Sequence, residues 1–135
     1  MNTNNKIKDI INNEFYAIER YNNHYGLQYK YNLSKQGSMF SLLNLKETLI
    51  RGLKNEDTFI ARLISLINYK IKSTVYGKDV LIYAKCNNYA TTRQKQEVIF
   101  LVDVLIEIQE QIKLKNTIKR EIEKTIVLAD KYTEA

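Results

Sequence analysis

Three acidic residues in the C-terminal third have a spacing that could hold a metal ion. Asp103, Glu107 and Glu110 follow one another at steps of four and three residues, so a helix would place all three on one face. Carboxylate oxygens are the ligands that Mg²⁺ prefers in proteins. The same spacing is also typical of a solvated face opposite an apolar one, and we favour this interpretation because apolar residues recur from Val98 to Ile112.

The segment Glu107-Ile-Gln-Glu110 resembles the Glu-x-x-Glu motif with which the all-helical nucleotide pyrophosphohydrolases bind Mg²⁺. The resemblance implies a helical Mg²⁺-dependent hydrolase. It covers this motif alone, because no second Glu-x-x-Asp/Glu follows at the place where the family has one. We therefore rank such a hydrolase last among the predicted functions.

Nucleophilic catalysis would have to use His24 or Cys86, the only histidine and the only cysteine. The segment Arg20-Tyr-Asn-Asn-His24 resembles the Arg-to-His motif of the HEPN ribonucleases, with a spacing one residue too short. A single cysteine excludes an intrachain disulfide and a Cys-rich metal site. The chain has no Gly-x-Ser-x-Gly, P-loop or Gly-x-Gly-x-x-Gly motif. We predict a non-enzymatic protein without catalytic residues, cofactor or bound metal.

The charge of the chain is basic and uneven. The net charge is +6, and residues 1–95 hold 15 Lys and Arg against 7 Asp and Glu. Such a surplus favours an anionic partner. Residues 46–76 could form two helices around a turn at residues 54–57, the outline of a helix-turn-helix, although the second helix is strongly apolar. The alternative function is therefore a dimeric DNA- or RNA-binding regulator. Its predicted phosphate contacts are Arg51, Lys54, Arg62, Lys70 and Lys72.

Tyrosine is the most unusual component, with ten in the chain and five of them between residues 16 and 31. Tyr is enriched at protein interfaces, and beside cations it can also stack on bases. The predicted partner-binding residues are Arg20, Tyr21, Tyr25, Tyr29, Lys30 and Tyr31. Our leading prediction is a small interaction protein that binds a macromolecular partner and occludes it. We favour another protein as that partner. The chain is small and rich in residues whose codons are AT-rich, as is typical of phage or plasmid accessory proteins that act as inhibitors or regulators.

The scarcity of turn-forming residues predicts a mostly α fold. The chain has no proline and four glycines, so it can reverse direction only a few times. Apolar residues at three- and four-residue steps predict helices over residues 3–23, 38–52, 55–76 and from Thr92 onward. We expect one domain, residues 1–135, built as an irregular bundle of about five helices.

Three regions leave the secondary structure open. Residues 27–33 alternate like a strand, which could pair with residues 39–45 to give an extended or hairpin element within residues 27–45. Residues 70–85 fit a helix better than a hairpin. The C-terminal region is either one long helix or a helix pair divided at Asn116 and Thr117. A single helix would be roughly 60 Å long, which predicts a homodimer through the C-terminal helix.

The N-terminal residues lack the apolar stretch of a signal peptide. The longest apolar run, residues 98–102, is far shorter than the roughly 20 residues of a membrane-spanning helix. We expect a cytoplasmic protein that does not associate with membranes.

Overall fold

The structure, a computed structural model, describes residues 5–14, 36–74 and 92–134. This part of the chain contains five helices and no strand, so the predicted mostly α bundle is confirmed. The first helix covers residues 5–14. The others are α2 (Gln36–Arg51), α3 (Glu56–Thr74), α5 (Thr92–Gln111) and α6 (Asn116–Glu134).

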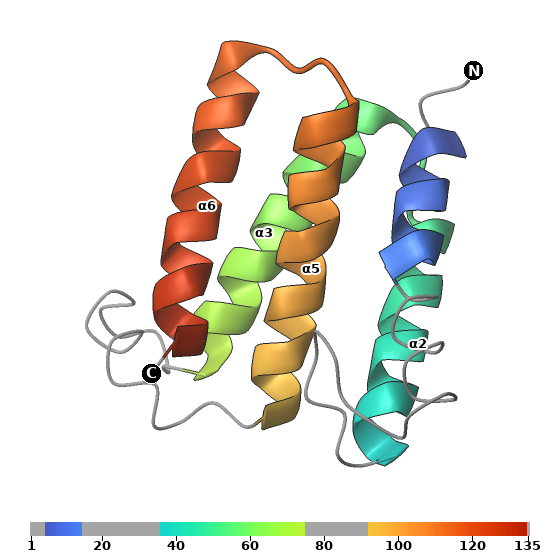
Figure 1. The fold of residues 1–135 in the computed structure, drawn as a ribbon, viewed down its shortest axis with the longest axis vertical. Coiled ribbons are helices and arrows are strands. Elements are labelled where there is room, and N and C mark those ends of the chain that lie inside the picture. Colours follow the sequence, from blue (N-terminus) through green and yellow to red (C-terminus); the bar gives the residue numbers. More distant parts are fainter. Residues whose placement is uncertain (1–4, 15–35, 75–91, 135) are drawn as a thin grey trace.

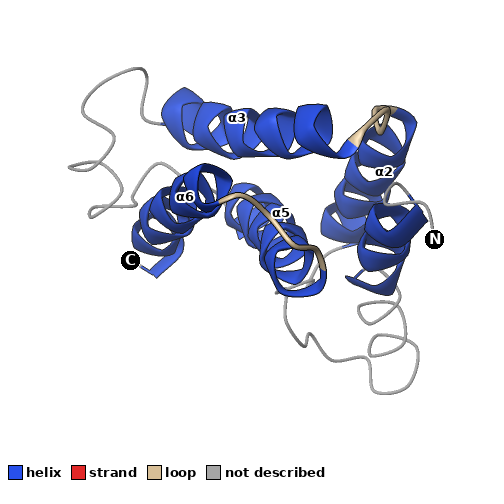
Figure 2. Cartoon of the chain, turned by 90° about the horizontal axis from the view of Figure 1, so that it is seen from above, coloured by secondary structure: helices blue, strands red, loops and turns tan. Residues whose placement is uncertain are grey.

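Helix α5 lies at the centre of this arrangement (Figure 1). It packs against α2, α3 and α6, and α3 also packs against α6. The α5–α6 pair is antiparallel, since α5 runs upward and α6 downward in Figure 1. Seen from above in Figure 2, α3 lies along one side of this pair.

The sequence of α5 explains its central place. Apolar residues occupy consecutive positions such as Phe100–Leu101 and Val104–Leu105, all of them 0% exposed. Consecutive positions on a helix point about 100° apart, so α5 is buried on several sides and needs several neighbours. The core that surrounds it draws on every described helix, including Ile7, Ile10 and Ile11 of the first one.

The start of α3 is fixed by local hydrogen bonding. The Oδ1 atom of Asn55 accepts a hydrogen bond from the backbone N–H of Thr58 at 2.9 Å, which is the geometry of an N-cap. Glu56 and Asp57 lie in the first turn, where the helix dipole favours negative charge. The cap and the acidic first turn together favour the start of α3 at Glu56.

The C-terminal region is a helix pair, and the alternative of a single long helix is wrong. Helix α5 ends at Gln111 and α6 begins at Asn116, with Leu114 buried in the link between them. The six-residue step from Ile112 to Ile118 explains the break, because a continuous helix would turn the second apolar stripe about 120° away from the first. The length argument for a homodimer therefore no longer applies, and the dimer stays a prediction.

Two of the extended alternatives are wrong in the part that is described. Residues 39–45 belong to α2, where Leu42 and Leu49 are buried two turns apart on one face. Residues 70–74 belong to α3, which continues the buried series Ile67 and Ile71. In both places the helical period of the apolar residues decides the structure. Residues 27–35 and 75–85 lie outside the described residues.

One polar side chain in the core has no partner among the described residues. Gln96 on α5 is 2% exposed, and neither its Nε2 nor its Oε1 atom forms a hydrogen bond. A buried amide without hydrogen bonds is destabilising, whereas an apolar group of the same shape is not.

We expect Gln96→Met to raise the free energy of unfolding by about 1–2 kcal/mol, because the unbranched Met removes the unpaired polar atoms and keeps the volume. Urea denaturation followed by circular dichroism measures this change. The exposed Gln111 on the same helix supplies the control, and Gln111→Met should stay within about 0.5 kcal/mol. A loss of stability in Gln96→Met would show that the amide is needed where it lies.

Candidate nucleic-acid interface

Helix α3 is sharply divided into an apolar and a polar face. The buried side consists of Phe59, Ile60, Leu63, Ile67 and Ile71. On the opposite side Arg62, Ser65, Tyr69 and Lys72 are all exposed, and their steps of three and four residues form one stripe. We call these four residues the outer face of α3. Figure 2 shows α5 and α6 on one side of α3 and no described helix on the other.

Tyr69 is the most exposed large hydrophobic residue of the described part of the chain, at 68%. An aromatic ring usually buries most of its surface in a core or an interface. Tyr69 instead stands between two cations on the outer face, three residues before Lys72 and seven after Arg62. A ring flanked by positive charge is the arrangement on which nucleic-acid bases stack.

The charges on α3 are separated along its length. Its acidic residues, Glu56 and Asp57, both lie in the first turn, and residues 58–74 contain none. Arg62 and Lys72 are ten residues apart, which is roughly 15 Å along a helix. The two cations can therefore reach different phosphates of one nucleic acid, with no carboxylate on the outer face to repel it.

The five cations predicted as phosphate contacts lie at different places in the structure. Arg62 and Lys72 share the outer face with Tyr69. Arg51 lies at the end of α2, with its side chain 80% exposed and 3.5 Å from Glu47, and Lys54 is exposed in the link between α2 and α3. The Nζ atom of Lys70 donates a hydrogen bond to Oε2 of Glu97 on α5 at 2.7 Å.

Ser65 and Tyr69 belong to this surface but were not predicted as site residues. The signal was present, because Arg62 and Tyr69 are seven residues apart and therefore two helical turns apart on one face. Residues 52–55 link α2 to α3, next to the turn predicted at residues 54–57, and the helix-turn-helix itself stays a prediction. In the described part of the chain, α2 packs against α5.

Several predicted site residues lie outside the described residues. These are Arg20, Tyr21, Tyr25, Tyr29, Lys30 and Tyr31, together with His24 and Cys86. The partner surface predicted for residues 20–31 therefore stays a prediction.

Asp103, Glu107 and Glu110, the acidic residues with a possible metal-binding spacing, all lie on α5 within the described residues. Glu107 accepts a hydrogen bond from Nε2 of Gln111 at 3.0 Å, and Glu110 is exposed. Over residues 5–14, 36–74 and 92–134, no three His, Cys, Asp or Glu side chains gather closely enough to hold a metal ion.

Comparison with known proteins adds no relative. The chain matches no protein-family model, and no curated protein or solved structure is significantly similar to it. Among the helices described here, none is both long enough and apolar enough to cross a membrane.

The contact between Lys70 and Glu97 ties α3 to α5, and its two side chains are only 25% and 17% exposed. We expect Lys70→Met to lower the free energy of unfolding by about 1–2 kcal/mol, because Glu97 would keep a partly buried charge without its partner. Chemical denaturation measures the loss. Lys72→Met, two residues further along the helix and exposed, should change stability by less than about 0.5 kcal/mol. Equal stabilities of the two variants would contradict a structural role for Lys70.

Proposed function

We propose that this chain is a small non-enzymatic binding protein that covers a nucleic acid through the outer face of α3 and so occludes it from other factors. The observation that carries the proposal is the exposed Tyr69 between Arg62 and Lys72, on a helix face without an acidic residue. This proposal develops the regulator that the sequence suggested as the alternative function.

Each residue type on the outer face suits a part of a nucleic acid. Arg62 and Lys72 would neutralise phosphates and release their counterions, which is the main source of sequence-independent affinity. Ser65 can donate its hydroxyl to a phosphate oxygen. Tyr69 offers a ring for stacking on an unpaired base or for packing against a sugar.

The packing of α3 supports its use as a binding helix. A helix that reads a groove must present a polar side to it, and the many apolar residues of α3 argue against this when the sequence is read alone. The buried set, such as Leu63 and Ile67, faces the bundle. The outer face is thereby left polar, and a DNA major groove about 12 Å wide admits one helix.

The overall charge favours the same class of partner. The chain carries +6, and residues 1–95, which include α3, hold the whole surplus. A field of this sign raises the encounter rate with polyanions at low ionic strength. The protein partner suggested for residues 20–31 and the homodimer remain separate proposals from the sequence, and they become the leading ones if no nucleic acid binds.

Removing the two cations of the outer face tests the proposal. We expect Arg62→Ala/Lys72→Ala to weaken binding to labelled duplex DNA and single-stranded RNA, and to reduce the log–log salt slope for the duplex by about 1.8, because two phosphate contacts are lost. Fluorescence anisotropy at several salt concentrations measures both quantities.

The matched control is Arg120→Ala/Lys131→Ala, which removes one Arg and one Lys from exposed positions of α6. It changes the net charge equally and should leave the salt slope unchanged. The proposal fails if both double variants lose affinity equally, or if the unmodified protein binds no nucleic acid at low salt.

Two substitutions of Tyr69 distinguish stacking by its ring from hydrogen bonding by its hydroxyl. We expect Tyr69→Ala to reduce the affinity for single-stranded RNA about tenfold, since stacking contributes roughly 1–3 kcal/mol per base, whereas Tyr69→Phe should keep it. The same anisotropy titration measures both variants. Loss of binding in Tyr69→Phe would assign the contact to the hydroxyl, and unchanged binding in Tyr69→Ala would exclude the ring from the interface.

A further inference from the structure

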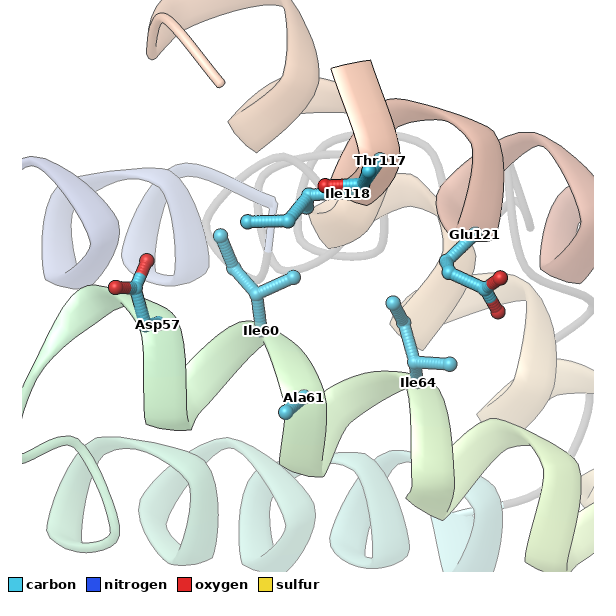
Figure 3. A pocket seen from close by; sticks show the side chains of 7 residues that line it. All are labelled: Asp57, Ile60, Ala61, Ile64, Thr117, Ile118 and Glu121. Atoms are coloured by element: carbon cyan, nitrogen blue, oxygen red, sulfur yellow. The ribbon is translucent and has the colours of Figure 1, made fainter. Parts of the chain in front are cut away.

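A groove opens between α3 and α6 on the flank of α3 beside its outer face (Figure 3). Its volume is about 330 Å³, which is at the small end of ligand-binding pockets. The groove is mostly apolar, with Ile60, Ala61 and Ile64 contributed by α3 and Ile118 by α6. Both helices contribute residues from their N-terminal halves.

The charged groups of the groove are two carboxylates. Asp57 of α3 and Glu121 of α6 line it together with Thr117. Figure 3 shows the isoleucine side chains between these two carboxylates. Glu121 also lies 3.7 Å from Lys124, and both side chains are more than half exposed, so this pair competes only weakly for the carboxylate.

This combination selects for charge as well as shape. An apolar body gains by leaving water in proportion to the area it buries on the isoleucines. A positive group gains from the two carboxylates, whereas a negative group is repelled by them. The groove is therefore acidic in a chain whose net charge is +6, and its preference is opposite to that of the outer face of α3.

We propose that this groove binds an amphipathic organic cation, a primary ammonium on a compact alkyl body. The alkyl body lies on Ile60, Ile64 and Ile118, and the ammonium lies against Asp57 or Glu121. The proposal does not depend on nucleic-acid binding, because none of these residues belongs to the outer face of α3.

Titration with hexylammonium, followed by NMR of ¹³C-labelled isoleucine methyl groups, tests the site. We expect saturable shifts centred on Ile60, Ile64 and Ile118. Hexan-1-ol keeps the apolar body and hexanoate reverses the charge, so affinity should fall in the order hexylammonium, hexanol, hexanoate. Equal affinity for all three, or shifts centred on other isoleucines, would overturn the proposal.

Two sets of variants locate the ligand. Ala61 is exposed at the groove, so Ala61→Phe should fill it and abolish binding without unfolding the bundle. Val127→Phe places the same ring at an exposed position of α6 outside the groove and should bind as the unmodified protein does. Equal binding by both phenylalanine variants would overturn the proposal.

The carboxylates are tested by Asp57→Asn/Glu121→Gln. This variant should lower the affinity for hexylammonium about fivefold, which is the scale of two exposed ion pairs. The affinity for hexanol should stay unchanged. Circular dichroism establishes that each variant is folded before titration, since Asp57 also lies in the first turn of α3. Unchanged affinity for hexylammonium would show that charge does not select the ligand.

Discussion

The burial of α5 is the constraint on which the other described helices depend. Residues such as Phe100, Leu101 and Val104 are 0% exposed and point in different directions from one helix. A helix that is apolar on several sides is stable in water only when other helices cover those sides. α2, α3 and α6 do so, and each of them is amphipathic enough to turn a polar side outward.

Both candidate binding surfaces follow from the way in which α3 covers the α5–α6 pair. Because α3 lies along one side of the pair (Figure 2), its far side is left as the outer face, with Arg62, Tyr69 and Lys72. The groove arises where α3 passes the start of α6, at Ile64 and Ile118. One helix thus presents a basic, aromatic surface and, on its flank, an acidic and apolar one.

Local sequence signals predicted the described fold well, and they failed where the answer depended on distant residues. The period of the apolar residues in α3 is a local signal, and it predicted the helix over residues 55–76. Lys70 was grouped with Arg62 from the sequence, and its contact with Glu97, 27 residues away on another helix, could not be predicted from local spacing. The groove joins Asp57 to Glu121, residues that no spacing rule connects before the packing is known.

A direct contact between the outer face of α3 and a nucleic acid can be tested by cross-linking. Tyr69 and Val127 are the two exposed large hydrophobic residues of the described chain, at 68% and 54%, and they lie on different helices. A photo-crosslinking phenylalanine at each position in turn, irradiated with labelled DNA or RNA, compares the two surfaces at similar exposure. We expect a cross-link from position 69 and none from position 127. A cross-link from position 127 alone, or from neither, would contradict it.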